Sequence, residues 1–280
     1  MAFVYITTEA LTREYNLAEC RVPGVVETYE RLADHYDTPS IHLGLEIVER
    51  AVAGEVVWYG DEPAEAEAAA STAGGGSSSS KYVFGSDGIH PHKSTGCAAY
   101  SQAVGRSLAA LEEQARPPRQ LLPAPIAPNN YEGAQLVGAD RAALSTGVQK
   151  ISPATAPAKP YANATGFLAR RLGDTFTLTF HGSMVGASMI VGPWTGDLVL
   201  TIDDGVPQHM QIYDTFCYRP NGRMGFYVLR DGLEKANHTL VVDVSPSVPN
   251  KESIMAVKNR HVPAEYLKDT DAVILAFGFM

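Results

Sequence analysis

The 280-residue sequence predicts an α/β domain followed by an all-β sandwich. Up to about residue 115, short apolar segments alternate with apolar stripes at helical spacing. Five prolines then fall within residues 116–128, which is typical of a linker. Beyond it, strands with alternating apolar residues follow one another without helices between them. We therefore divide the chain into residues 1–115, a linker at 116–128 and residues 129–280.

The first domain shows an alternation of strands and helices. A continuous apolar segment at residues 2–6 is typical of a strand that is buried on both faces of a parallel sheet. Further strands are predicted at residues 40–43 and 82–84, and a helix follows each of the three. The helical stripes consist of Val25, Tyr29, Leu32 and Tyr36, of Leu45, Ile47, Val48 and Val52, and of Tyr100, Val104, Leu108 and Leu111. This order predicts a parallel sheet with covering helices.

Two features of this domain call for an explanation. A fully buried strand needs neighbours on both sides, so a strand at residues 2–6 indicates either an edge strand or missing upstream polypeptide. Residues 61–80 contain a low-complexity insert that ends in a Gly/Ser tether. The tether can be a lid over a site or a tolerated surface insertion. We favour the insertion because it holds no aromatic or catalytic residue.

In the second domain apolar residues recur at every second position, which is the period of strands with one buried and one exposed face. Phe176, Leu178 and Phe180 alternate with threonines, and similar alternation recurs at residues 198–202 and 240–244. A final apolar strand covers residues 273–279. Turns rich in Gly, Asp, Asn and Pro separate these segments, as expected for a β-sandwich of the jelly-roll type.

Composition and spacing exclude several functions. The balance of 22 Lys+Arg and 31 Asp+Glu gives a net charge of −9, which disfavours a nucleic-acid partner. No apolar run approaches the roughly 18 to 20 residues that span a membrane. Cys20, Cys97 and Cys217 have no zinc or redox spacing and are expected to be unpaired. His90 and His92 lack a third ligand at a suitable spacing, and no phosphate loop is present, so we expect no metal and no cofactor.

One segment carries recognisable chemistry, Asp87-Gly88-Ile89-His90. It lies between a predicted strand and a predicted helix, where α/β folds place their sites. Acyl transfer needs an imidazole that takes the proton of a serine, and a carboxylate that fixes the tautomer of that imidazole. An aspartate three residues before a histidine can supply that carboxylate from the same loop. The alternative is a turn aspartate that caps backbone amides beside an exposed histidine.

The segment SDGIHPHKSTGCAAYSQAVGRSL resembles the last conserved block and final helix of SGNH (GDSL-like) hydrolases. The earlier segment ETYERLADHYDTPSIHLG is similar to the helix and strand that precede that block, so the resemblance covers about residues 2–111. It implies a flavodoxin-like parallel sheet and a serine esterase in which Asp87 orients His90 as the general base. The family's Gly-Asp-Ser motif and its oxyanion-hole blocks are absent from this chain. We therefore expect an N-terminally truncated hydrolase that is inactive alone.

Residues from about 130 to 280 resemble the jelly-roll sandwich attached to some bacterial SGNH hydrolases. The resemblance implies an acylated or acetylated carbohydrate as substrate. Trp194, Tyr213 and Tyr218 can stack on a sugar ring, although packing at a strand end is the more frequent role of such a tryptophan. Self-association through the N-terminal strand is a further expectation. The alternative function is a non-catalytic carbohydrate-binding or scaffold protein with a degenerate hydrolase remnant.

Overall fold

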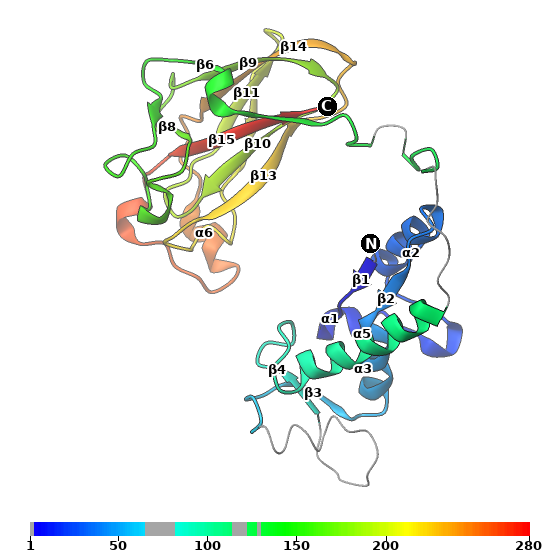
Figure 1. Ribbon diagram of the computed structural model, residues 1–280. Coiled ribbons are helices and arrows are strands. Elements are labelled where there is room, and N and C mark those ends of the chain that lie inside the picture. The colour runs from blue at the N-terminus through cyan, green and yellow to red at the C-terminus, as the bar shows by residue number, and fades with distance from the viewer. Residues whose placement is uncertain (1–2, 65–81, 114–121, 128–129) are drawn as a thin grey trace. The chain divides into compact units, whose positions relative to one another are not determined.

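The computed structural model describes residues 3–64, 82–113, 122–127 and 130–280 (Figure 1). These residues form two compact units, which divide the chain between residues 128 and 129. Most of the predicted insert at residues 61–80, including the whole Gly/Ser tether, lies outside the described residues. The assignment of the units to a hydrolase domain and an accessory domain stays a prediction.

The N-terminal unit contains two pairs of parallel strands. Strand β1 (Phe3–Tyr5) pairs with β2 (Ser40–His42), and β3 (Val56–Tyr59) pairs with β4 (Tyr82–Gly85). The predicted strands at residues 2–6, 40–43 and 82–84 are thus confirmed, whereas β3 was not predicted. The prediction that this strand is buried on both faces was wrong, because Val4 in β1 is 51% exposed.

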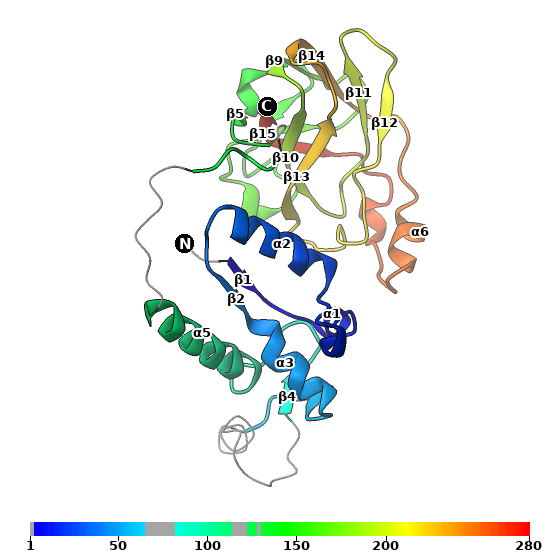
Figure 2. The ribbon, with the colours of Figure 1, turned by 90° about the vertical axis from the view of Figure 1, so that its right-hand side faces the viewer.

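Three longer helices cover these strands, and two short helical segments precede them. They are α1 (Glu9–Thr12), a 3-10 turn (Leu17–Glu19), α2 (Gly24–His35), α3 (Leu43–Val52) and α5 (Gly96–Glu113). In both views α2 lies beside β1 and α5 beside β2 (Figures 1 and 2).

The helices are confirmed where the apolar stripes predicted them, but their buried faces differ in part. Helix α5 buries Ala99 and Ala103, because small side chains let the helix approach the strands closely. In α2 the predicted Tyr29 is 44% exposed, and its ring lies 6.0 Å from that of Tyr5. Val52, at the end of α3, is 75% exposed.

The C-terminal unit is a sandwich of two antiparallel sheets (Figure 2). One sheet has the order β13-β10-β15-β8-β7, with β5 also on β15, and the other has the order β12-β11-β14-β9-β6. The strands of the first are β5 (Gln135–Gly138), β7 (Gln149–Lys150), β8 (Phe167–Ala169), β10 (Val185–Val191), β13 (Arg223–Arg230) and β15 (Ala272–Phe279). Those of the second are β6 (Ala143–Leu144), β9 (Phe176–Gly182), β11 (Leu198–Ile202), β12 (Gln208–Met210) and β14 (Ala236–Val244).

Alternating side chains fill the space between the two sheets. The predicted strands of this unit are confirmed, with Phe176, Leu178 and Phe180 buried in a core that also contains Ala187 and Met189. Short helical segments connect the strands at Ala139–Arg141, Lys159–Tyr161, α6 (Lys251–Ala256) and Ala264–Tyr266. Among the described residues, no helix is both long and apolar enough to cross a membrane.

Candidate functional site

The loop between β4 and α5 brings Asp87 and His90 together. One carboxylate oxygen, Asp87 Oδ1, accepts hydrogen bonds from the backbone nitrogens of Ile89 (2.9 Å) and His90 (2.8 Å). The other oxygen, Asp87 Oδ2, lies 2.7 Å from His90 Nδ1. The carboxylate therefore caps the turn and contacts the imidazole at the same time. The geometry is compatible with a carboxylate that orients the imidazole and also with a turn aspartate that caps backbone amides.

Two glycines allow the loop to fold this tightly. Gly88 has a φ of +71°, and a Cβ at this position would lie 3.0 Å from the ring of Tyr59. A Cβ at Gly85 would lie only 2.1 Å from the carbonyl oxygen of His90. The backbone nitrogen of Glu9 donates to Gly88 O (2.9 Å), which ties the loop to the start of α1.

Polar contacts on the C-terminal side of the loop fix the path into α5. The backbone nitrogen of His92 donates to Phe84 O (2.7 Å), and His92 Nε2 lies 2.8 Å from Gly60 O. Thr95 Oγ1 donates to Val83 O. His92 is thus an anchor of the loop, and the described residues contain no group of three side chains placed to hold a metal ion.

The ionised Asp87 carboxylate selects one tautomer of the His90 imidazole. Hydrogen bonds from the His90 and Ile89 backbone and from the His90 ring hold the pKa of Asp87 well below its usual range. An ionised carboxylate only accepts hydrogen bonds, so the hydrogen of the neutral imidazole resides on Nδ1. His90 Nε2 is then free to accept a proton, and the His90 side chain is 83% exposed. In the described part of the chain, no hydroxyl forms a hydrogen bond with His90 Nε2.

The three aromatic residues considered for sugar stacking lie in the C-terminal unit. Trp194 and Tyr213 are 1% and 0% exposed, so neither ring offers a face to a ligand. This burial corrects the expectation for both residues, and Trp194 packs instead at 6.2 Å from the ring of Tyr266. Tyr218 is partly exposed, but the guanidinium of Arg260 covers its ring at 4.1 Å from the centroid.

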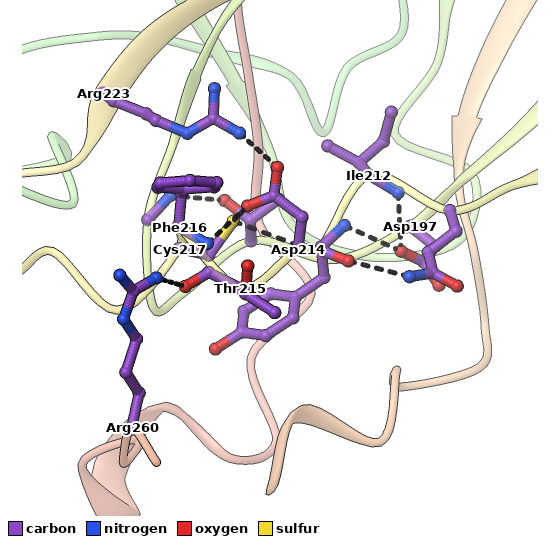
Figure 3. A network of polar contacts seen from close by, with 12 residues as sticks. Asp197, Ile212, Asp214, Thr215, Phe216, Cys217, Arg223 and Arg260 are labelled. Carbon is purple, nitrogen blue, oxygen red and sulfur yellow. Dashed lines mark hydrogen bonds and ion pairs between the residues drawn. The ribbon is translucent and has the colours of Figure 1, made fainter. Parts of the chain in front are cut away.

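The loop between β12 and β13 presents an aromatic residue that the sequence reasoning did not single out. Phe216 is 48% exposed, with the guanidinium groups of Arg223 and Arg260 at 5.8 and 5.2 Å from its ring centroid. The two arginines approach from the first residue of β13 and from the segment after α6 (Figure 3). No local motif indicates this arrangement, because it joins residues that are distant in sequence.

Solved structures share the fold of this chain. A two-domain esterase (CEX) active on acetylated mannans, co-crystallised with mannopentaose, matches 90% of this chain and 57% of its own, with a TM-score of 0.58 and 15% identity. A second structure of a two-domain esterase (CEX) active on acetylated mannans matches 90% of this chain and 58% of its own, with a TM-score of 0.56 and 14% identity. A family two carbohydrate esterase from Cellvibrio japonicus matches 52% of this chain and 33% of its own, with a TM-score of 0.31 and 9% identity, too low to define a shared fold.

The chain therefore spans less than three fifths of the two-domain esterase structures that it resembles. The sequence matches no known family and no curated protein significantly. The TM-scores of 0.58 and 0.56 show a shared fold, and at 15 and 14% identity the likeness shows nothing finer.

Proposed function

We propose that this chain carries the acid–base part of a carboxylic ester hydrolase of the SGNH type. The observation that carries this proposal is the 2.7 Å contact between Asp87 Oδ2 and His90 Nδ1, on the loop that leaves a parallel strand. A carboxylate in this position orients the imidazole and stabilises the imidazolium that forms when Nε2 takes a proton. His90 is the general base in this proposal, and Asp87 positions it.

An acylated or acetylated carbohydrate is the substrate class that we favour. The fold likeness to a two-domain esterase active on acetylated mannans supports this choice, and it extends over both units of the chain. An acetyl ester on a sugar presents a small acyl group and a hydroxyl leaving group. A general base that activates a serine suits both, because the same imidazole can return the proton to the departing hydroxyl.

The nucleophilic serine and the oxyanion donors come, in this proposal, from polypeptide outside these 280 residues. The chain contains no Gly-Asp-Ser sequence. An imidazole–carboxylate pair without these groups gives little rate enhancement, because the members of a triad act as a unit. We therefore expect this chain alone to leave ester substrates unhydrolysed.

The edge of β1 is where we propose that such polypeptide joins the sheet. Within the described residues β1 pairs only with β2, and the Val4 and Ile6 side chains are 51% and 60% exposed. An apolar strand with one free edge is a template for another strand. When nothing else occupies this edge, we expect two copies of the chain to associate through it.

A serine-directed phosphonate probe tests the division of roles. We expect the 280-residue chain to stay unlabelled, and the polypeptide encoded by the native locus to be labelled at one serine. That labelling should require His90, since the imidazole activates the serine. Stoichiometric labelling of any serine in this chain alone would contradict the proposal that the nucleophile lies elsewhere. Labelling unaffected by His90→Ala would contradict the role of the imidazole.

A further inference from the structure

Five side chains at one end of the C-terminal unit alternate guanidinium groups and aromatic rings. We define the arginine–aromatic cluster by these residues: Phe216, Tyr218, Arg219, Arg223 and Arg260. Each ring has two guanidinium groups within 6 Å of its centroid. Cation–π contacts of this kind hold charged groups in place while they keep their hydrogen-bond donors available.

The loop that presents the cluster is held by carboxylates. Asp197, which is 4% exposed, accepts hydrogen bonds at Oδ1 from the backbone nitrogens of Ile212 (2.9 Å) and Tyr213 (3.2 Å). Asp214 accepts from the backbone nitrogen of Phe216 at 2.8 Å and pairs with Arg223 (Figure 3). The cluster is therefore organised by the fold and needs no ligand to assemble it.

Neighbouring acids balance only part of the charge of the cluster. Arg223 is paired with Asp214, and Arg260 donates to the carbonyl oxygen of Thr215. Within the residues that the structure describes, neither Arg219 nor Arg260 forms an ion pair with a carboxylate. Their guanidinium carbons lie 5.9 and 4.1 Å from the Tyr218 ring centroid, so the two charges are at most about 10 Å apart.

We propose that the arginine–aromatic cluster binds a carboxylate-bearing sugar chain, with Arg219 and Arg260 as the groups that contact its carboxylates. The planar fork of a guanidinium matches a carboxylate with two parallel hydrogen bonds. The ring of Tyr218 is covered by guanidinium groups, so recognition rests on charge more than on stacking of a neutral sugar. The choice of a glycan among anionic polymers rests on the proposed function. A uronate polymer repeats its carboxylates along the chain, so neighbouring residues can engage both arginines.

The test compares polymers that differ in charge. Binding of the full chain to polygalacturonate, to its methyl-esterified form and to neutral glucomannan is measured by affinity electrophoresis at low ionic strength. We expect retention by polygalacturonate only, and loss of that retention at high salt. No retention by polygalacturonate, or equal retention by the methyl ester, would overturn the proposal. Equal or stronger binding of dextran sulfate would also overturn it, by showing a surface that accepts any polyanion.

Variants identify the residues that bind. Arg219→Gln removes the charge of an exposed side chain that contacts the Tyr218 ring, and we expect it to weaken binding about threefold to tenfold. Arg219→Lys keeps the charge and should retain more binding than the glutamine variant. Arg230→Gln is the matched control, because Arg230 lies on the same unit and contacts Gln208 instead. Equal effects of R219Q and R230Q, or none from R219Q, would contradict the assignment. Ester hydrolysis plays no part in this assay, so a failure to bind the polymer and a failure of the proposed hydrolysis can be told apart.

Discussion

His90 Nδ1 lies 2.7 Å from Asp87 Oδ2, and the same carboxylate accepts both backbone hydrogens of the turn that carries the imidazole. Position and tautomer of the ring are thus fixed by one side chain. This contact is local, since the two residues are three apart. Every chemical role that we assign to the N-terminal unit depends on it.

Asp87→Asn should change the tautomer of His90. An amide can donate a hydrogen to Nδ1, which moves the ring hydrogen to Nε2 and removes the acceptor that a serine needs. In the product of the native locus we expect about a 10⁴-fold loss of kcat, with the melting temperature nearly unchanged. Nitrogen NMR of the His90 ring reports the tautomer. An unchanged tautomer in the variant would contradict the role of Asp87.

Gly88→Ala should destabilise the site loop. The positive φ disfavours any residue with a Cβ, and the new Cβ would press on Tyr59. We expect a loss of about 1–2 kcal/mol in the free energy of unfolding of the N-terminal unit, measured in urea. Gly105→Ala in α5 is the control, because a Cβ there meets nothing and helix propensity favours alanine. Equal losses in both variants would contradict a requirement specific to Gly88.

Lys251→Met should unfold the C-terminal unit more easily. The Lys251 side chain is 2% exposed, and its Nζ donates to the carbonyl oxygens of Pro193, Tyr266 and Asp269 at 2.8, 2.9 and 2.7 Å. Removing the ammonium leaves buried acceptors without a donor, at a cost of about 3–5 kcal/mol. Lys258→Met, at an exposed position after the same helix, should change stability by less than about 0.5 kcal/mol. Thermal melting of both variants decides between these outcomes.

Asp271 should make the C-terminal unit lose stability as the pH rises from about 4 to about 6. Burial raises the pKa of Asp271 to about 6, although Arg170 lies 3.6 Å away and opposes this shift. The folded state therefore holds a proton in a range where the unfolded state has released it, and stability falls as that proton leaves. The change is at most about 3 kcal/mol. In Asp271→Asn the slope of unfolding free energy against pH should be flatter over this range, and an unchanged slope would contradict the assignment.

Val4→Lys should prevent self-association through β1. A charged side chain on an edge strand disfavours pairing with a second strand, because pairing would desolvate the ammonium. We expect the wild-type chain to form dimers in light scattering at high concentration and V4K to stay monomeric. Val52→Lys is the control, since Val52 is also exposed but lies at the end of a helix. Dimers of V4K that match the wild type would place the association elsewhere.

Local patterns predicted the parts of the molecule that depend on local sequence. The strands of the sandwich follow from alternation such as Phe176, Leu178 and Phe180, and the Asp87–His90 pair follows from two residues on one tight loop. The faces of α2 and α5 were predicted less well, because burial depends on which side the sheet covers. Large apolar residues do not report that side when alanines such as Ala103 make the contact.

The burial of the aromatic residues could not be predicted from local sequence either. Trp194 and Tyr213 are of residue types that can stack on a sugar ring, but tertiary packing buries both. Phe216 and Arg260 meet across 44 residues of sequence, through a loop and the segment after α6, and no spacing rule indicates such a contact. The sequence shows that a loop contains an aromatic residue, whereas only the fold shows which cationic side chains surround that residue.

The central claim is that His90, oriented by Asp87, is the general base of an esterase. The most direct measurement is hydrolysis of acetylated mannan by the polypeptide that the native locus encodes, for the wild type and for His90→Ala. We expect acetate release by the wild type and a loss of at least about 10³-fold in the variant, with both proteins folded. No acetate release by the wild type, or equal release by the His90→Ala variant, would contradict this account.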